Sequence, residues 1–355
     1  MSMKPMAAAA AGALSLYAGN AEAEFTPTLE CDDVETIEFH GTLFYACEED
    51  VTPEIMAEFD LIAKVKEYER EKLGFSETPN YREYRNGLPG REIEGVYLLD
   101  VVPPMQIAQD LVSVHLQSAM QYREPVAVPT HFWSMEDDLS DEEVFYRGQG
   151  LDVHRRFTSN FGSGCALDPD FIERDTARKI YTVLHEDLHN HNIYVWGKRL
   201  DRDLEEASAN VFGKVATIDY VGLYYGTGTQ IYEDSANQLE DELKYAEFLI
   251  SIYNEIEAIS ADDISDEEKA RQQGAVIARA GRHYSNITNI SSILNDIPYR
   301  RLFPLMYEVY KAQPDMGTFV DVLKEMPANE YAAIGYLERH CNGCSYSPLT
   351  RHVIW

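Results

Sequence analysis

The chain has 355 residues, of which 45% are apolar and 23 are tyrosine, so we expect a folded protein with a sizeable core. Its 61 acidic and 30 basic residues give a net charge of −31. A surface of that sign repels phosphate backbones and anionic lipids, which argues against a nucleic-acid-binding protein.

The first residues have the order of an export signal. Lys4 gives a positive start, the apolar stretch "PMAAAAAGALSLYAG" follows, and "AEA" (21–23) supplies small residues at cleavage spacing. The apolar stretch is too short to span a bilayer, and so is every later one. We therefore expect a signal peptide at 1–23 and one mature domain at 24–355, exported to the periplasm or secreted. A frayed, Ala-rich leader is the alternative.

The five cysteines fit an oxidising compartment. Cys31 and Cys47 flank the alternating, strand-like stretch "VETIEFHGTLFYAC", and Cys341 and Cys344 form "CNGC", while Cys165 is left over. Both pairings are plausible disulfides, but spacing alone leaves the connectivity open. A CxxC can also be a redox pair or half of a zinc knuckle, although the chain has no second CxxC.

The predicted elements change from strands to helices along the chain. Residues 54–73 have helical periodicity, with one apolar face formed by Ile55, Phe59, Ile62, Val65 and Tyr68. Three extended runs follow, "EGVYLLDVVPP", "EPVAVPTHFW" and "GLDVHRRFTSNFGSG". Helices are then predicted at 176–192, 202–220, 236–258 and 265–284, with two more between Pro298 and Leu337. This order predicts an α+β fold.

The helix at 176–192 carries the clearest chemical signal, "HEDLH". Its apolar stripe predicts a buried helix and consists of Ala177, Ile180, Tyr181, Leu184 and Leu188. On that helix His185 and His189 are one turn apart and project together, which is the geometry by which two imidazoles bind one zinc ion. Glu186 is placed to take a proton from a water activated by the metal.

A third ligand is available on the next predicted helix. Glu206 stands in its first turn and Asn210 lies one turn later on the same side, while the buried face is formed by Leu204, Ala207, Val211, Val215 and Ile218. We expect Glu205 to lie on the exposed side of this helix, where changing it should cost little. The alternative is that Glu205 and Glu206 are both part of a solvated acidic first turn, favoured by the helix dipole.

An HExxH followed by a glutamate helix resembles the gluzincin metallopeptidases, and "EASANVFG" resembles the thermolysin-type glutamate helix. In that group an aspartate one turn after the ligand glutamate hydrogen-bonds a ligand histidine. Asn210 stands there in this chain, and its amide oxygen could accept the same bond without charge.

A wider resemblance links most of the mature chain to the family of predicted bacterial zinc aminopeptidases. It is carried, in order, by "EREKLGFSETPNYREY", "GLDV", "SNFGSGCALDP", "HEDLHNHNIYV", "SDEEKARQQGAVIARAGRHY", "NITNISSI" and "FVDVLKEM". The resemblance implies a zincin-like fold with a small N-terminal sheet region and a mainly helical remainder. It also implies a Zn²⁺ cofactor held by His185, His189 and Glu206, Glu186 as catalytic base, and a peptide substrate cleaved by an aminopeptidase.

Four departures from that family keep other interpretations open. Asp187-Leu188 replaces a small apolar pair, Glu205 replaces an asparagine, "SNFGSG" stands where related enzymes bind the substrate amine, and Cys31 lacks a lipobox. The alternatives are a zinc endopeptidase, or a non-catalytic exported binding protein with a structural or decayed HExxH. Asp187 and Asn210 are the features that favour the binding protein. Residues considered for stabilising the oxyanion are Tyr194, His283 and Tyr284, each with a structural role as the alternative.

Overall fold

The structure is a computed structural model that describes residues 27, 29, 31–86, 96–102, 131–133, 143–144, 147–148, 152–158 and 165–341. The predicted signal peptide, the "SNFGSG" segment and Cys344 lie outside these residues. Among the helices that are described, none is long and apolar enough to cross a membrane.

The first element is a hairpin of β1 (Val34–Phe39) and β2 (Thr42–Cys47), antiparallel from Val34↔Cys47 to Phe39↔Thr42. The stretch between the first two cysteines was expected to be strand-like and is two strands. His40 and Gly41 form the turn with φ of 49° and 77°, a left-handed conformation that suits the twist of a hairpin.

The predicted pairing of Cys31 with Cys47 is confirmed, with their Cα atoms 6.0 Å apart. Cys341 is also disulfide-bonded, and its partner lies outside the described residues. Cys165 is a buried thiol.

Helix α2 (Pro53–Lys72) follows the short helical turn η1 (Glu48–Asp50). The Thr52 hydroxyl caps it by accepting a hydrogen bond from the Ile55 amide, and proline at the first position needs no amide donor. Its predicted apolar face is confirmed as fully or almost fully buried. Phe59 of this face stacks on Phe44 of β2 with ring centroids 4.7 Å apart, so the helix covers the hairpin.

A second sheet has the order β4-β3-β5 and is antiparallel throughout. Its strands are β3 (Val96–Val102), β4 (His131–Trp133) and β5 (Asp152–Thr158), one in each predicted run. Asn289 connects the sheet to the helices, since its side-chain amide donates to the Val153 carbonyl at 2.8 Å.

The remaining chain is helical: α5 (Pro169–Ile172), α6 (Thr176–Asn190) with a π-helical turn η2 (His191–Val195), α7 (Arg202–Tyr224), α8 (Gln230–Ala261), α9 (Asp266–His283), α10 (Ile290–Arg300), α11 (Phe303–Lys311), α12 (Met316–Glu325) and α13 (Glu330–His340). The expectation of two helices between Pro298 and Leu337 is wrong. Pro298 lies inside α10, and three further helices follow it. The sequence pattern of this region predicts fewer, longer helices. The region is divided by short connections and by side-chain caps at Asn289, Asp315 and Asn329.

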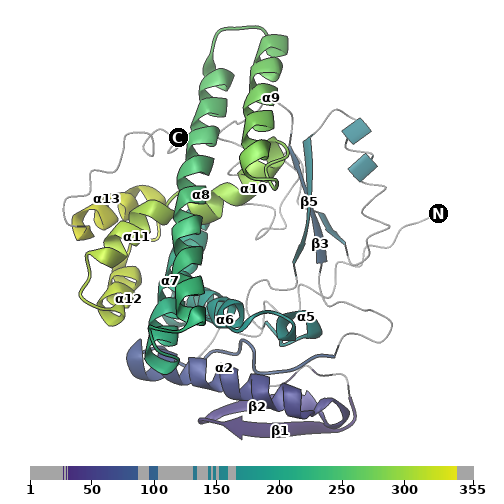
Figure 1. Cartoon of the computed structure of the whole chain (residues 1–355), viewed down its shortest axis with the longest axis vertical. Helices are drawn as coiled ribbons and strands as arrows, with labels where there is room; N and C mark the ends of the chain where they lie inside the picture. The colour runs from purple at the N-terminus through teal and green to yellow at the C-terminus, as the bar shows by residue number, and fades with distance from the viewer. Residues whose placement is uncertain are drawn as a thin grey trace.

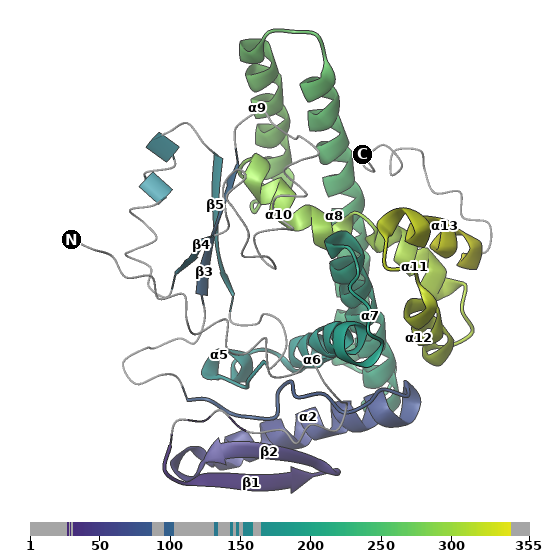
Figure 2. The ribbon, with the colours of Figure 1, turned by 180° about the vertical axis from the view of Figure 1, so that it is seen from behind.

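Helices α6 and α7 lie at the centre of the molecule (Figures 1 and 2). The hairpin and α2 lie below them, the β4-β3-β5 sheet lies to one side, and α11–α13 lie to the other. Helices α8 and α9 form a long antiparallel pair that projects from this body. A large core joins the hairpin, α2, α6, α7 and α11–α13, and a smaller one joins α8, α9 and α10. The α+β class is therefore confirmed, with helices dominating two small antiparallel sheets.

Candidate metal centre

Helix α6 is positioned by its cap and by its buried stripe. The Asp175 carboxylate accepts from the Arg178 amide at 2.9 Å, which fixes the first turn. Four of the five residues of the predicted stripe are buried, and Tyr181 is partly buried. The helix is thus held with the HEDLH segment facing α7.

Helices α6 and α7 pack antiparallel and approach closely at Gly213. A Cβ atom added to Gly213 would lie 3.1 Å from the Tyr181 ring and 3.3 Å from the His185 Cβ, tighter than ordinary side-chain contacts. The absent side chain therefore lets the two helices meet. Because Glu206 and Asn210 lie on the same face of α7 as Gly213, this contact also brings them to α6.

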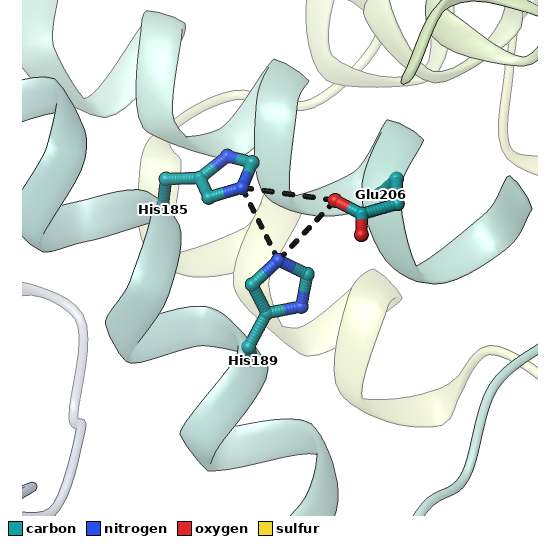
Figure 3. A group of neighbouring side chains, drawn as sticks. All are labelled: His185, His189 and Glu206. Carbon is teal, nitrogen blue, oxygen red and sulfur yellow. Dashed lines mark hydrogen bonds and ion pairs between the residues drawn. The ribbon is translucent and has the colours of Figure 1, made fainter. Parts of the chain in front are cut away.

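His185, His189 and Glu206 converge at this crossing (Figure 3). Their donor atoms form a triangle: 3.2 Å between the two Nε2 atoms, and 3.8 and 3.5 Å from Glu206 Oε2 to His185 and His189. A tetrahedral zinc ion with bonds of about 2.0–2.2 Å places its donors roughly 3.3–3.6 Å apart. Two imidazoles and one carboxylate at this spacing fit zinc and leave a fourth position open.

The surroundings favour the protonation states that bind a metal at two of the three donors, a neutral His185 and an ionised Glu206. Burial and the charge of His189 lower the pKa of His185 to about 3, so its imidazole is neutral. Burial opposes ionisation of Glu206, but its hydrogen bond to His189 and the charge of His189 lower its pKa to about 2. Burial also disfavours the charged form of His189, yet hydrogen bonds to Glu205 and Glu206 raise its pKa well above its usual value. A divalent cation would take over the role of that proton.

Glu205 is a partner of the site and not a solvated residue. It is only 8% exposed, and its Oε1 accepts from His189 Nδ1 at 2.8 Å and from the Asn192 amide at 3.1 Å. The expectation that Glu205 lies on the exposed side of its helix is wrong. A metal in the donor triangle would bind Nε2 and leave the proton on Nδ1, so Glu205 would fix both the tautomer and the ring orientation.

The other histidine is supported by a neutral chain of hydrogen bonds. His185 Nδ1 lies 3.3 Å from the Tyr181 hydroxyl, which donates to Asn210 Oδ1 at 2.9 Å. The Asn210 amide in turn donates to the Tyr299 carbonyl at 3.2 Å. Asn210 was expected to accept directly from a ligand histidine, but Tyr181 fills the space between them.

Glu186 follows His185 in α6 and lies close enough to His189 and Glu206 for their charges to affect it. It is 8% exposed, and no hydrogen bond to its carboxylate is found in the described part of the chain. Burial raises its pKa to about 7, with the charges of Glu206 and Asp187 adding to the effect and His189 opposing it. A carboxylate with a pKa near neutrality can both accept and return a proton.

Asp187, the unusual residue inside HEDLH, points away from the centre into a buried polar network. Its carboxylate is fully buried and accepts from Lys66 Nζ at 2.7 Å, the Thr78 hydroxyl at 2.5 Å and the Asn80 amide at 3.0 Å. Burial and the Asp187 charge raise the pKa of the adjacent Glu69 well above its usual value. This departure from the family pattern therefore anchors α6 to α2 without disturbing the ligands.

The remaining predicted residues lie elsewhere. His191 uses both ring nitrogens in backbone hydrogen bonds, because Nδ1 donates to the Asp187 carbonyl at 2.8 Å and Nε2 accepts from the Ser76 amide at 2.9 Å. The His283 and Tyr284 rings contact the Phe248 ring of α8, and Tyr284 packs against the smaller core while His283 is exposed. Their ring contacts are structural, so they lose support as oxyanion donors.

Comparison with protein-family models, curated proteins and solved structures finds no match to this chain.

Proposed function

We propose that this protein is an exported zinc-dependent peptidase with a zincin-like arrangement of α6 and α7, in which His185, His189 and Glu206 hold the metal. The observation that carries the proposal is the triangle of donors spaced for zinc, with the buried Glu186 next to it in sequence and without a hydrogen-bond partner among the described residues. Structural zinc sites use four protein ligands, whereas three ligands and an open position are typical of catalytic ones.

The chemistry divides between the metal and one side chain. Zinc, when bound, lowers the pKa of a coordinated water toward neutrality and polarises the scissile carbonyl. Glu186 accepts the proton of the attacking water and returns it to the departing amine. Glu205 and Tyr181 keep the two imidazole rings aimed at the metal through their Nδ1 atoms.

Among peptidases we propose an aminopeptidase, on the strength of the family resemblance of the sequence. The segment that would bind the substrate amine, "SNFGSG", lies outside the described residues. An endopeptidase is the neighbouring possibility, and analysis of the products released from a mixed peptide library separates the two.

The rival class is a non-catalytic binding protein with a decayed site, which rested on Asp187 and Asn210. Both residues have well-defined partners: Asp187 anchors α6 to Lys66, and Asn210 supports Tyr181. Both residues therefore have structural roles that do not require the metal site to have decayed. This favours the enzyme over the binding protein.

The test is Glu186→Gln, with Glu206→Gln beside it. Glu186→Gln should keep zinc and fold while turnover falls about 10²–10⁴-fold, because a catalytic base is lost. Glu206→Gln should lose zinc, because a neutral amide replaces an anionic ligand. Glu247→Gln, exposed on α8, is the control for removing a carboxylate. Full activity of Glu186→Gln towards the peptide library would reject the proposed mechanism.

Export has its own test. Lys4, the Ala-rich stretch and "AEA" predict a mature N-terminus near Glu24. N-terminal sequencing of the periplasmic or secreted protein should find it, and material that still begins at Met1 contradicts the prediction.

A further inference from the structure

Two basic side chains flank Tyr181 at one edge of the candidate metal centre. Arg178 Cζ lies 4.9 Å and Lys214 Nζ 4.6 Å from the centroid of the Tyr181 ring. The same ring lies 5.5 Å from the His185 ring, centroid to centroid. The two cations are therefore one aromatic side chain away from a metal donor.

Neither cation forms an ion pair within the part of the chain that the structure describes. In the described ranges no carboxylate lies within ion-pair distance of Arg178 or Lys214, whereas the nearby Arg300 is held by Glu242 at 2.9 Å and by Asp296 at 3.3 Å. This positive edge is opposite in sign to the chain, whose net charge is −31. An anion that reached it would meet two charges still available for pairing.

The environment of Lys214 is unfavourable for its own charge. Partial burial lowers its pKa, and the charges of Arg178 and Arg300 lower it further, against the opposing effect of Glu242. Bringing a carboxylate to this group would relieve that cost. The edge is also accessible, since Arg178 is exposed and Lys214 and Tyr181 are only partly buried.

We propose that Arg178 and Lys214 bind a carboxylate of the peptide substrate. The inference rests on the proposed peptidase function and adds a specificity to it: short peptides with a free C-terminal carboxylate, or peptides with an acidic side chain at that place. An extended peptide advances about 3.3 Å per residue, so a carboxylate about two or three residues from the scissile bond would reach the cations. Such a site suits removal of the first residue from tri- or tetrapeptides, because the far end of a short substrate is then held.

The experiment measures binding without turnover, by calorimetry on zinc-loaded full-length protein carrying Glu186→Gln. The probes are tetra-alanine with a free carboxylate and tetra-alanine amide, and a second pair of amidated peptides, Ala-Ala-Ala-Glu-Ala and Ala-Ala-Ala-Gln-Ala, tests a side-chain carboxylate. The free acid or the Glu peptide should bind about 10-fold more tightly than its neutral counterpart, as a charge-assisted contact predicts. The pair with the larger ratio identifies the source of the carboxylate.

The same ratios are then measured after adding Arg178→Gln and Lys214→Gln together. They should fall to about 1, with an unchanged melting temperature and zinc content, whereas Lys324→Gln, exposed on α12, should leave them intact. Equal binding of acidic and neutral peptides, or a ratio that survives the double substitution, overturns the carboxylate site. If the ratio behaves as expected but the unsubstituted protein cleaves none of these peptides, the proposed reaction fails and the carboxylate site stands.

Discussion

Glu205 provides the sharpest test of how the centre is built, because the sequence alone made it dispensable. Its carboxylate lies 2.8 Å from His189 Nδ1 in a buried position, so the hydrogen bond is charge-assisted and little screened. Loss of a hydrogen-bond partner of a metal-ligating histidine typically costs 10–100-fold in metal affinity. Glu205→Gln keeps an acceptor but loses the charge, so we expect about 10-fold weaker zinc binding. Glu205→Ala also leaves the Asn192 amide without its acceptor, and we expect zinc binding to weaken about 100-fold.

The assay is a zinc titration against a chelator of known affinity, with a melting curve for each variant. Glu247→Gln on the exposed face of α8 controls for the general effect of removing a negative charge. A tenfold loss corresponds to about 1.4 kcal/mol, well within the resolution of a competition titration. Wild-type zinc affinity in a normally folded Glu205→Ala protein would refute the argument that this carboxylate supports His189.

Three further substitutions test contacts that hold the fold together, two beside the candidate metal centre and one in the N-terminal hairpin. Each is measured by denaturant unfolding. Gly213→Ala should destabilise the protein by about 1–3 kcal/mol and weaken zinc binding, because its Cβ would lie 3.1 Å from the Tyr181 ring. Lys66→Met leaves the fully buried Asp187 without its cation and should cost about 3–5 kcal/mol. Cys47→Ser opens the hairpin disulfide, which spans 16 positions, and should cost about 3 kcal/mol. Unfolding free energies within about 0.5 kcal/mol of the parent would contradict each in turn.

Much of the fold could be predicted because local periodicity and capping specify it. The apolar stripes of α2, α6 and α7 are buried as their spacing predicts, except that Tyr181 and Ile218 are only partly buried. Strands β3, β4 and β5 each lie within a predicted strand run. Where elements are short, the pattern fails. The first strand-like stretch folds back on itself at His40-Gly41, because a turn of two residues barely interrupts the hydrophobic pattern. The boundary expected at Pro298 is also wrong, since α10 continues through this proline.

The grouping of His185, His189 and Glu206 could also be predicted, but the residues that support them could not. His185 and His189 share a face by their spacing on one helix. Whether Glu205 or Glu206 turns toward them depends on how α7 crosses α6, and that is fixed by a tertiary contact at Gly213. Both acids in fact face the centre. The partners of Asp187 come from α2 and the segment after it, more than 100 positions earlier in the chain, so no local pattern indicates them.

The two ligand histidines receive unequal support, and the arrangement of charges suggests why. His189 has an anionic partner, Glu205, whereas His185 has the neutral chain of Tyr181 and Asn210. The neutral partner is on the side that carries the two unpaired cations. A carboxylate in place of the Asn210 amide would strengthen His185 as a ligand, but it would also attract those cations.

Asn210→Asp therefore separates metal binding from substrate recognition. The added charge should leave zinc affinity unchanged or higher, since it strengthens the chain to His185. It should also lower the preference for carboxylate peptides several-fold, because it competes for Arg178 and Lys214 at short range. Stability should fall by about 1–3 kcal/mol, since the Asn210 amide no longer donates to the Tyr299 carbonyl at 3.2 Å. Asn210→Ala is the matched control: it loses the same donor without adding charge, so the carboxylate preference should remain. If the two variants lose the preference equally, the neutral residue at this position serves packing alone and not the binding of an anionic substrate.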